Sequence, residues 1–163
     1  MNSAQIQNDA INQPLEAFHS LDTDTQLGLF WFIYKEMGKS ITPAAPGAST
    51  ASPEIAEGLF NQVKELSHEE QLQIQRDLIT GADTQWTRLY GSLSDTTKLL
   101  FWYLLSQGMD NGTIIPVPGD YQLPAPGQEL LERIKQMPFE EQITLFRSYV
   151  SPMGAEPHAG SEI

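Results

Sequence analysis

The stretch LGLFWFIYKEMGKS, residues 27–40, begins with eight uncharged residues in a row, and four of the eight are aromatic. A second stretch, LLFWYLLSQGM at residues 99–109, has nearly the same pattern. A helix at the surface of a protein carries an apolar stripe with polar residues opposite, whereas a helix that is apolar all round is enclosed. Both stretches are of the enclosed kind, so we expect two helices that run through the middle of the molecule.

Signals that begin and end helices recur along the rest of the chain. Asp22, Ser67 and Ser94 are predicted N-caps, and Ser67 with Glu70 forms a capping box. The helices predicted from these signals are about 14–20 (opened by Pro14), 23–37 (stopped near Gly38), 53–66, 67–81, 83–91, 94–109 (with Gly112 just past its end), and two segments after Pro124 and Pro138. No stretch shows a convincing strand alternation, so the sequence predicts an all-α fold.

The second half of the chain repeats the first. Leu27 aligns with Leu99 and Met37 with Met109, and after one deletion in the linker Gln71 aligns with Gln142. Repeat 1 covers about 21–81 and repeat 2 about 93–153. Because each unit is too small to bury its apolar face alone, we expect two interleaved helical bundles related by a pseudo-twofold axis. They form a single domain over 1–163, with a flexible tail at 154–163.

The charge balance excludes several classes of partner. Nine basic against 21 acidic residues leave a formal charge of −12, which repels nucleic-acid phosphates and anionic lipid surfaces. No apolar run reaches the roughly 17–25 residues of a membrane helix, and the N-terminus lacks the pattern of a secretion signal. We therefore expect a soluble intracellular protein that binds no nucleic acid and does not insert stably into membranes.

No pattern of catalytic or metal-ligating residues stands out. The chain has no cysteine, and its three histidines lack the spacing of a metal site. Acidic pairs such as Glu69–Glu70 and Glu140–Glu141 fall in the first turns of helices, where they interact favourably with the helix dipole. The sequence thus predicts neither a metal site nor an enzyme.

The two aromatic stretches differ in one informative way. Leu27, Trp31 and Tyr34 share one face of the first helix, and Trp102 and Ser106 share one face of the second. Tyr34 and Ser106 are repeat partners, so one copy has a ring where the other has a small group. This mismatch suits an elongated, asymmetric guest between the bundles. The alternative is that the rings are only hydrophobic core.

Two long phrases carry a resemblance to a known family. FWFIYKEMGKSITPAAPGA and KLLFWYLLSQGMDNGTIIPVPGDYQL resemble the N-terminal helical domain of the orange carotenoid protein and the stand-alone helical carotenoid proteins of cyanobacteria. The similarity runs from roughly Leu21 to Met153. It implies a non-enzymatic, water-soluble protein that holds one ketocarotenoid, such as canthaxanthin, echinenone or 3'-hydroxyechinenone, in a tunnel between two helical bundles. It further implies photoprotection by quenching of singlet oxygen and of antenna excitation. Because the chain ends at Ile163, we expect a free-standing carrier without a regulatory half.

The resemblance also implies which side chains line the pigment, position by position. These residues are Leu27, Phe30, Trp31, Tyr34, Glu57, Leu72, Gln75, Leu99, Trp102, Tyr103, Ser106, Met109, Val117, Pro118, Tyr121, Ile143, Thr144 and Met153. Ser106 replaces a glycine of the family domain, and Gln75 and Arg76 replace a methionine and a cysteine. The ends of the tunnel are therefore expected to be more polar here.

Partners follow from the same resemblance. It implies a separate carotenoid carrier that resembles the missing C-terminal domain, the phycobilisome as an antenna, and a place in the cytoplasm near the thylakoid membrane. Arg147 matches an arginine that two-domain relatives use for docking; the alternative is a plain surface cation. A monomer is favoured over an oligomer. The competing hypotheses are a helical interaction module that binds a protein through an acidic face and, last, an enzyme on a helical scaffold.

Overall fold

The structure is a computed structural model that describes residues 3–44 and 53–156. Within these residues the chain forms eight α-helices and no strand, which confirms the all-α prediction. The helices are α1 (Ser3–His19), α2 (Thr23–Ala44), α3 (Pro53–Lys64), α4 (His68–Thr80), α5 (Gln85–Gly91), α6 (Asp95–Asn111), α7 (Ala125–Lys135) and α8 (Phe139–Val150). None of these described helices has the length and apolarity needed to cross a membrane.

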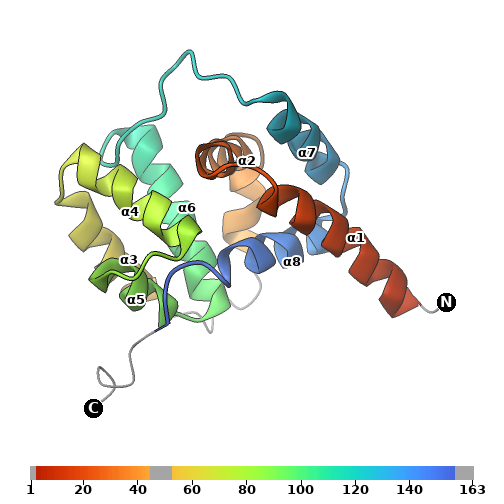
Figure 1. Cartoon of the computed structure of the whole chain (residues 1–163), viewed down its shortest axis with the longest axis horizontal. Coiled ribbons are helices and arrows are strands. Elements are labelled where there is room, and N and C mark those ends of the chain that lie inside the picture. The colour runs from red at the N-terminus through yellow and green to blue at the C-terminus, as the bar shows by residue number, and fades with distance from the viewer. Residues whose placement is uncertain (1–2, 45–52, 157–163) are drawn as a thin grey trace.

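The helices form two groups: one contains α1, α2, α7 and α8, and the other contains α3 to α6 (Figure 1). α1 packs on α7 and α8, and α2 packs on α7, whereas α3 packs on α6, and α4 on α5. α2 contacts α4 and α6, and α6 contacts α8, so these helices join the two groups. The N-terminal helices thus lie with the C-terminal ones, and the two central helices are the two aromatic stretches.

The pairing of helices matches the repeat in the sequence. α3 packs on α6 as α7 packs on α2, and α2 contacts α4 as α6 contacts α8. Two buried glutamines act alike: Gln71 Nε2 donates to the Val63 carbonyl at 3.3 Å, and Gln142 Nε2 donates to the Ile134 carbonyl at 2.8 Å. Each ties the beginning of one helix to the end of the helix before it. The pseudo-twofold axis itself stays a prediction.

Several predicted helix ends are confirmed by their capping contacts. Ser67 and Glu70 form the reciprocal capping box at the beginning of α4, and Asp22 Oδ1 accepts a hydrogen bond from Thr25 N at 2.7 Å. Gly81 and Gly112 follow α4 and α6 with φ of 78° and 89°, the left-handed conformation that glycine adopts without steric cost.

Two predicted helix boundaries were wrong, because packing overrides the local signal. α1 begins at Ser3 rather than at Pro14, which lies inside the helix. The carbonyl of Pro14 accepts a hydrogen bond from the buried Tyr149 hydroxyl at 3.1 Å, which fixes this turn on α8. α2 continues past Gly38 to Ala44. Gly38 serves packing, since a Cβ there would lie 3.1 Å from the ring of Tyr34.

Candidate functional site

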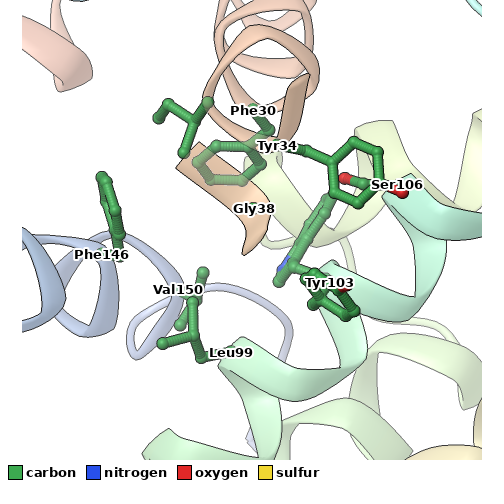
Figure 2. A pocket seen from close by; sticks show the side chains of 10 residues that line it. Phe30, Tyr34, Gly38, Leu99, Tyr103, Ser106, Phe146 and Val150 are labelled. Atoms are coloured by element: carbon green, nitrogen blue, oxygen red, sulfur yellow. The ribbon is translucent and has the colours of Figure 1, made fainter. Parts of the chain in front are cut away.

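A small apolar cavity lies between the two central helices and α8. Its volume is about 50 Å³. The lining comes from three helices (Figure 2): Phe30, Ile33, Tyr34 and Gly38 of α2; Leu99, Trp102, Tyr103 and Ser106 of α6; and Phe146 and Val150 of α8. The cavity therefore lies where the two helical groups meet.

Two aromatic pairs bridge α2 and α6 at this cavity. The ring centroids of Phe30 and Trp102 are 5.0 Å apart with the planes at 66°, and those of Tyr34 and Tyr103 are 5.5 Å apart at 61°. Both are edge-to-face contacts, the geometry that the ring quadrupole favours. Phe30 and Tyr34 are one helical turn apart on α2. Their partners Trp102 and Tyr103 are neighbours on α6, so both helices turn rings toward the cavity.

The polar atoms of Trp102 and Tyr34 have partners in the protein. Trp102 Nε1 donates to the hydroxyl of Tyr90 at 3.0 Å, and Tyr34 Oη donates to Asp110 Oδ2 at 3.2 Å. Burial, followed by the negative charge of Asp110, raises the pKa of Tyr34 above its usual value. The hydroxyl of Tyr34 therefore stays protonated near neutral pH. The surface that lines the cavity is mainly aromatic and aliphatic.

The lining suits recognition of an apolar, flat guest and offers little for catalysis. Ser106 is the one small polar side chain among the lining residues, and the lining contains no carboxylate, histidine or lysine. Among the described residues, no three histidine or acidic side chains come together as a metal site. Gly38 has no Cβ, which would lie 3.1 Å from the ring of Tyr34, so the backbone of α2 comes close to this ring at the cavity.

The structure brings together six of the predicted pigment-lining residues around this cavity. They are Phe30, Tyr34, Leu99, Trp102, Tyr103 and Ser106. All of them come from the two aromatic stretches, residues 27–40 and 99–109. The other predicted residues lie outside the lining of this cavity.

One group of predicted residues lies on the connector between α6 and α7. Tyr121 lies against Gly28 of α2, so closely that a Cβ at Gly28 would collide with the tyrosine ring. The ring also stacks on Phe32, with centroids 6.2 Å apart. Val117 is half-buried and Pro118 is exposed. This side of α2 is thus covered by the connector.

Met153 lies in a second, open hollow of about 450 Å³ between α1, α2 and the end of α8. Phe18 and Tyr149 also line this hollow, and the ring of Phe18 stacks on Tyr149 and on Phe30, with centroids 3.9 and 5.4 Å apart. Phe30 lines the central cavity as well, so this stack of three rings lies between the two hollows.

The remaining predicted residues are scattered around the helices. Thr144 lines a third hollow of about 380 Å³ together with Arg147, on the outer side of α8. Gln75 is buried, and its Nε2 has no hydrogen-bond partner within the described residues. Glu57 is exposed on α3, and Trp31 stacks on Tyr34. Leu27, Leu72, Met109 and Ile143 are buried or half-buried in the helix packing.

Four lining residues were missed from the sequence: Ile33, Gly38, Phe146 and Val150. Two signals could have found some of them. Gly38 follows Tyr34 by one turn, and Ile33 follows Phe30 by three residues, so both share the ring-bearing face. Phe146 is the repeat partner of Gln75, which was predicted, so applying the repeat to Gln75 would have pointed to Phe146.

Comparison with known proteins identifies the family. Residues 4–156 match the family described as the orange carotenoid protein, N-terminal. The chain belongs to this family. An orange carotenoid-binding domain-containing protein of Nostoc sp. PCC 7120 is 48% identical over 151 residues, which are 93% of this chain and 87% of that protein. The orange carotenoid-binding protein of Synechocystis sp. is 39% identical over 90% of this chain, but over only 45% of its own length.

Solved structures of the family agree with the fold. The red carotenoid protein of Anabaena (Nostoc) sp. PCC 7120, described as binding canthaxanthin, is 66% identical with a TM-score of 0.81, over 90% of this chain and 99% of that one. The orange carotenoid protein of the same organism, also binding canthaxanthin, is 42% identical with a TM-score of 0.80, over 91% of this chain and 46% of that one. These relatives are described by the pigment they bind rather than by a reaction.

Proposed function

We propose that the chain binds one ketocarotenoid between its two helical groups and protects against light damage by quenching singlet oxygen. The observation that carries the proposal is the aromatic cavity between α2 and α6. It occurs in a chain that is 66% identical to a red carotenoid protein described as binding canthaxanthin. The family and the cavity chemistry therefore point to the same ligand class.

The residues of the cavity fit such a pigment. A carotenoid is a long apolar polyene, and removing its surface from water is favourable by about 25 cal/mol per Å². The rings of Tyr34, Trp102 and Tyr103 offer flat apolar faces, and the polar atoms of Tyr34 and Trp102 are bonded to Asp110 and Tyr90. A bound carotenoid would supply the conjugated electrons that take up excitation energy and release it as heat.

The size of the cavity bears on how a pigment would enter it. At about 50 Å³ it is well below the roughly 300–1,000 Å³ of small-molecule pockets. Binding therefore needs the lining rings of α2 and α6 to move apart or rotate. Predicted residues outside the cavity, such as Leu27, Tyr121 and Met153, are proposed contacts along the longer path of the guest.

The proposal extends to partners and to place. The chain matches less than half of the Synechocystis orange carotenoid-binding protein, which holds a further part that this chain does not match. We propose that a separate protein resembling that part donates pigment to this chain or accepts pigment from it. We further propose that the protein quenches phycobilisome excitation, acts in the cytoplasm beside the thylakoid membrane, and is a monomer.

Expression in bacteria that make canthaxanthin tests the proposal. We expect the purified wild-type protein to carry a tightly bound visible chromophore. The double variant Tyr34→Ala with Trp102→Ala should retain less pigment or show a shifted spectrum, because both rings line the cavity. Trp86→Ala is the control, since Trp86 is half-buried on α5 and does not line the cavity.

The outcomes separate binding from its location. A colourless wild-type protein contradicts the proposed function and favours a helical interaction module instead. A coloured wild-type protein whose double variant has unchanged colour and yield contradicts the placement of the pigment at Tyr34 and Trp102.

A further inference from the structure

Tyr90 is a fully buried residue of α5 that does not line the central cavity but contacts two elements that do. Its hydroxyl accepts a hydrogen bond from Trp102 Nε1 of α6 at 3.0 Å and donates one to the carbonyl of Val150 at 2.7 Å. Trp102 and Val150 are both lining residues, on opposite helical groups. One hydroxyl therefore fixes the indole on α6 relative to the end of α8.

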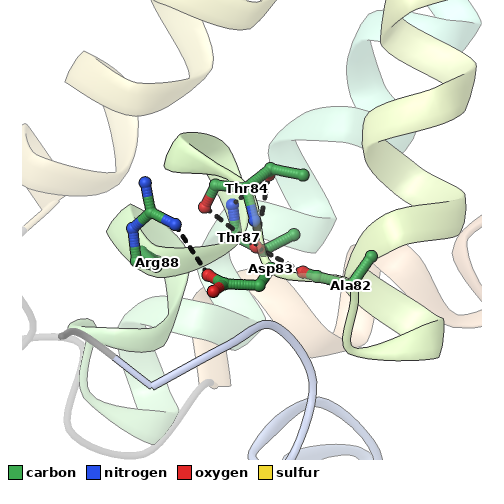
Figure 3. Close-up of polar contacts among 5 residues, drawn as sticks. All are labelled: Ala82, Asp83, Thr84, Thr87 and Arg88. Carbon is green, nitrogen blue, oxygen red and sulfur yellow. Dashed lines mark hydrogen bonds and ion pairs between the residues drawn. The ribbon is translucent and has the colours of Figure 1, made fainter.

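The helix that carries Tyr90 is short but firmly held at its beginning (Figure 3). The Thr84 and Thr87 side chains cap α5 reciprocally, and Thr87 Oγ1 donates to the carbonyl of Ala82 at 2.6 Å. Arg88 forms an ion pair with Asp83 at 2.7 Å. α5 is thus a fixed base from which the Tyr90 ring reaches into the interior.

A second contact reinforces the same link between the helical groups. Lys98 of α6 is buried, and its Nζ donates to the carbonyl of Ser151 at 2.7 Å while lying 5.4 Å from the centre of the Tyr90 ring. The Ser151 hydroxyl also donates to Asp95 Oδ1 at 2.8 Å. The end of α8 is therefore held by three side chains from α5 and α6, and Tyr90 is the one that also contacts the indole.

We propose that Tyr90 is a positioning residue: it fixes the plane of the Trp102 indole against the cavity and thereby sets the colour of a bound carotenoid. The effect on colour rests on the proposed function, whereas the positioning of the indole does not. The absorption of a polyene depends on its conformation and on the charges and rings beside it. A ring held by its N–H group in one orientation presents one fixed environment, whereas a ring released from this bond can rotate.

The test is Tyr90→Phe, which keeps the ring and removes only the hydroxyl. The control is Gln142→Met, because Gln142 is also buried and also donates to a backbone carbonyl, that of Ile134 at 2.8 Å, but lines neither the central cavity nor the Met153 hollow and has no bond to Trp102. Each protein is prepared with canthaxanthin and without pigment. We expect Tyr90→Phe to move the carotenoid absorption maximum, and Gln142→Met to leave it in place.

Two further readouts separate positioning from a general loss of stability. In the pigment-free protein, the indole N–H resonance of Trp102, assigned by its loss in Trp102→Phe, should shift in Tyr90→Phe and exchange about fivefold faster, the factor for one lost hydrogen bond. In the Trp102→Phe background, Tyr90→Phe should cause no additional shift of the carotenoid band, because the residue through which Tyr90 acts is gone.

Each outcome decides one part of the inference. An unchanged Trp102 resonance in Tyr90→Phe overturns the positioning role, whether or not the protein binds pigment. A shifted resonance with an unmoved carotenoid band, or equal band shifts in Tyr90→Phe and Gln142→Met, overturns the effect on colour. A colourless wild-type protein refutes the proposed function and with it the effect on colour, while the resonance still tests the positioning role.

Discussion

Replacing Gln71 with alanine should destabilise the fold strongly, because this side chain joins three parts of the chain. Gln71 is 1% exposed. Its Nε2 lies 3.2–3.4 Å from three carbonyls at and just after the end of α3 and 3.2 Å from the carbonyl of Thr113. Its Oε1 accepts a hydrogen bond from Ile115 N at 2.8 Å. The amide has two N–H donors and one oxygen acceptor, so about three of these contacts can be well-formed hydrogen bonds at the same time.

The magnitude follows from that count. Each bond contributes about 1 kcal/mol, and unsatisfied buried groups cost about 1–3 kcal/mol, so we expect Gln71→Ala to lower the free energy of unfolding by about 2–4 kcal/mol. Urea unfolding measures it. The matched control is Gln73→Ala: this exposed glutamine lies two residues further along α4, its amide donates to Asp77 at 2.9 Å, and we expect a loss below about 0.5 kcal/mol. Similar losses in the two variants would refute the role assigned to Gln71.

Two further perturbations test other parts of the structure. Gly28→Ala should lower the free energy of unfolding, measured in urea, by about 1–3 kcal/mol, because the new methyl group collides with the Tyr121 ring. In the control Gly58→Ala the methyl group meets open space on α3, so the free energy of unfolding should rise by about 0.5–1 kcal/mol. Equal effects of the two variants would contradict the Tyr121 contact. Hydrogen bonds from Thr25 lower the pKa of Asp22 below 3.8, so its carboxylate stabilises the fold above that pH, and this contribution is lost as the pH falls through the lower folded-state pKa. The melting temperature of Asp22→Asn should therefore lie below that of the wild type at neutral pH and approach it below pH 3.8, and a gap that stays constant with pH would refute this assignment.

The parts of the fold that could be predicted are those decided by local chemistry. Ser67 with Glu70 and the glycines at 81 and 112 mark helix ends through contacts within a few residues, and the structure has those ends. The helix boundaries predicted at Pro14 and Gly38 were wrong: at Pro14 the decisive contact comes from a distant segment, whereas at Gly38 the helix continues through the glycine. Pro14 is held in α1 by Tyr149 of α8, and Gly38 lies inside α2 beside the ring of Tyr34.

The site was predictable only where it lies on the two aromatic helices. Tyr34 and Trp102 were found because ring-rich helical faces are visible in the sequence. Phe146 and Val150 belong to α8, and only the packing of α6 on α8 brings them to the cavity. Tyr90 gives no sequence signal of its importance, since its role depends on one hydroxyl that reaches two other helices.

The central claim is that α2 and α6 hold a carotenoid between their rings. A crystal structure of the protein purified from canthaxanthin-producing bacteria tests it most directly. The account predicts a polyene between α2 and α6, in van der Waals contact with Tyr34 and Trp102. The centroids of the ring pairs Tyr34–Tyr103 and Phe30–Trp102 should then lie farther apart than the 5.5 Å and 5.0 Å of the present structure. Pigment bound elsewhere on the surface, with both ring pairs still in contact across an unwidened cavity, would contradict the account.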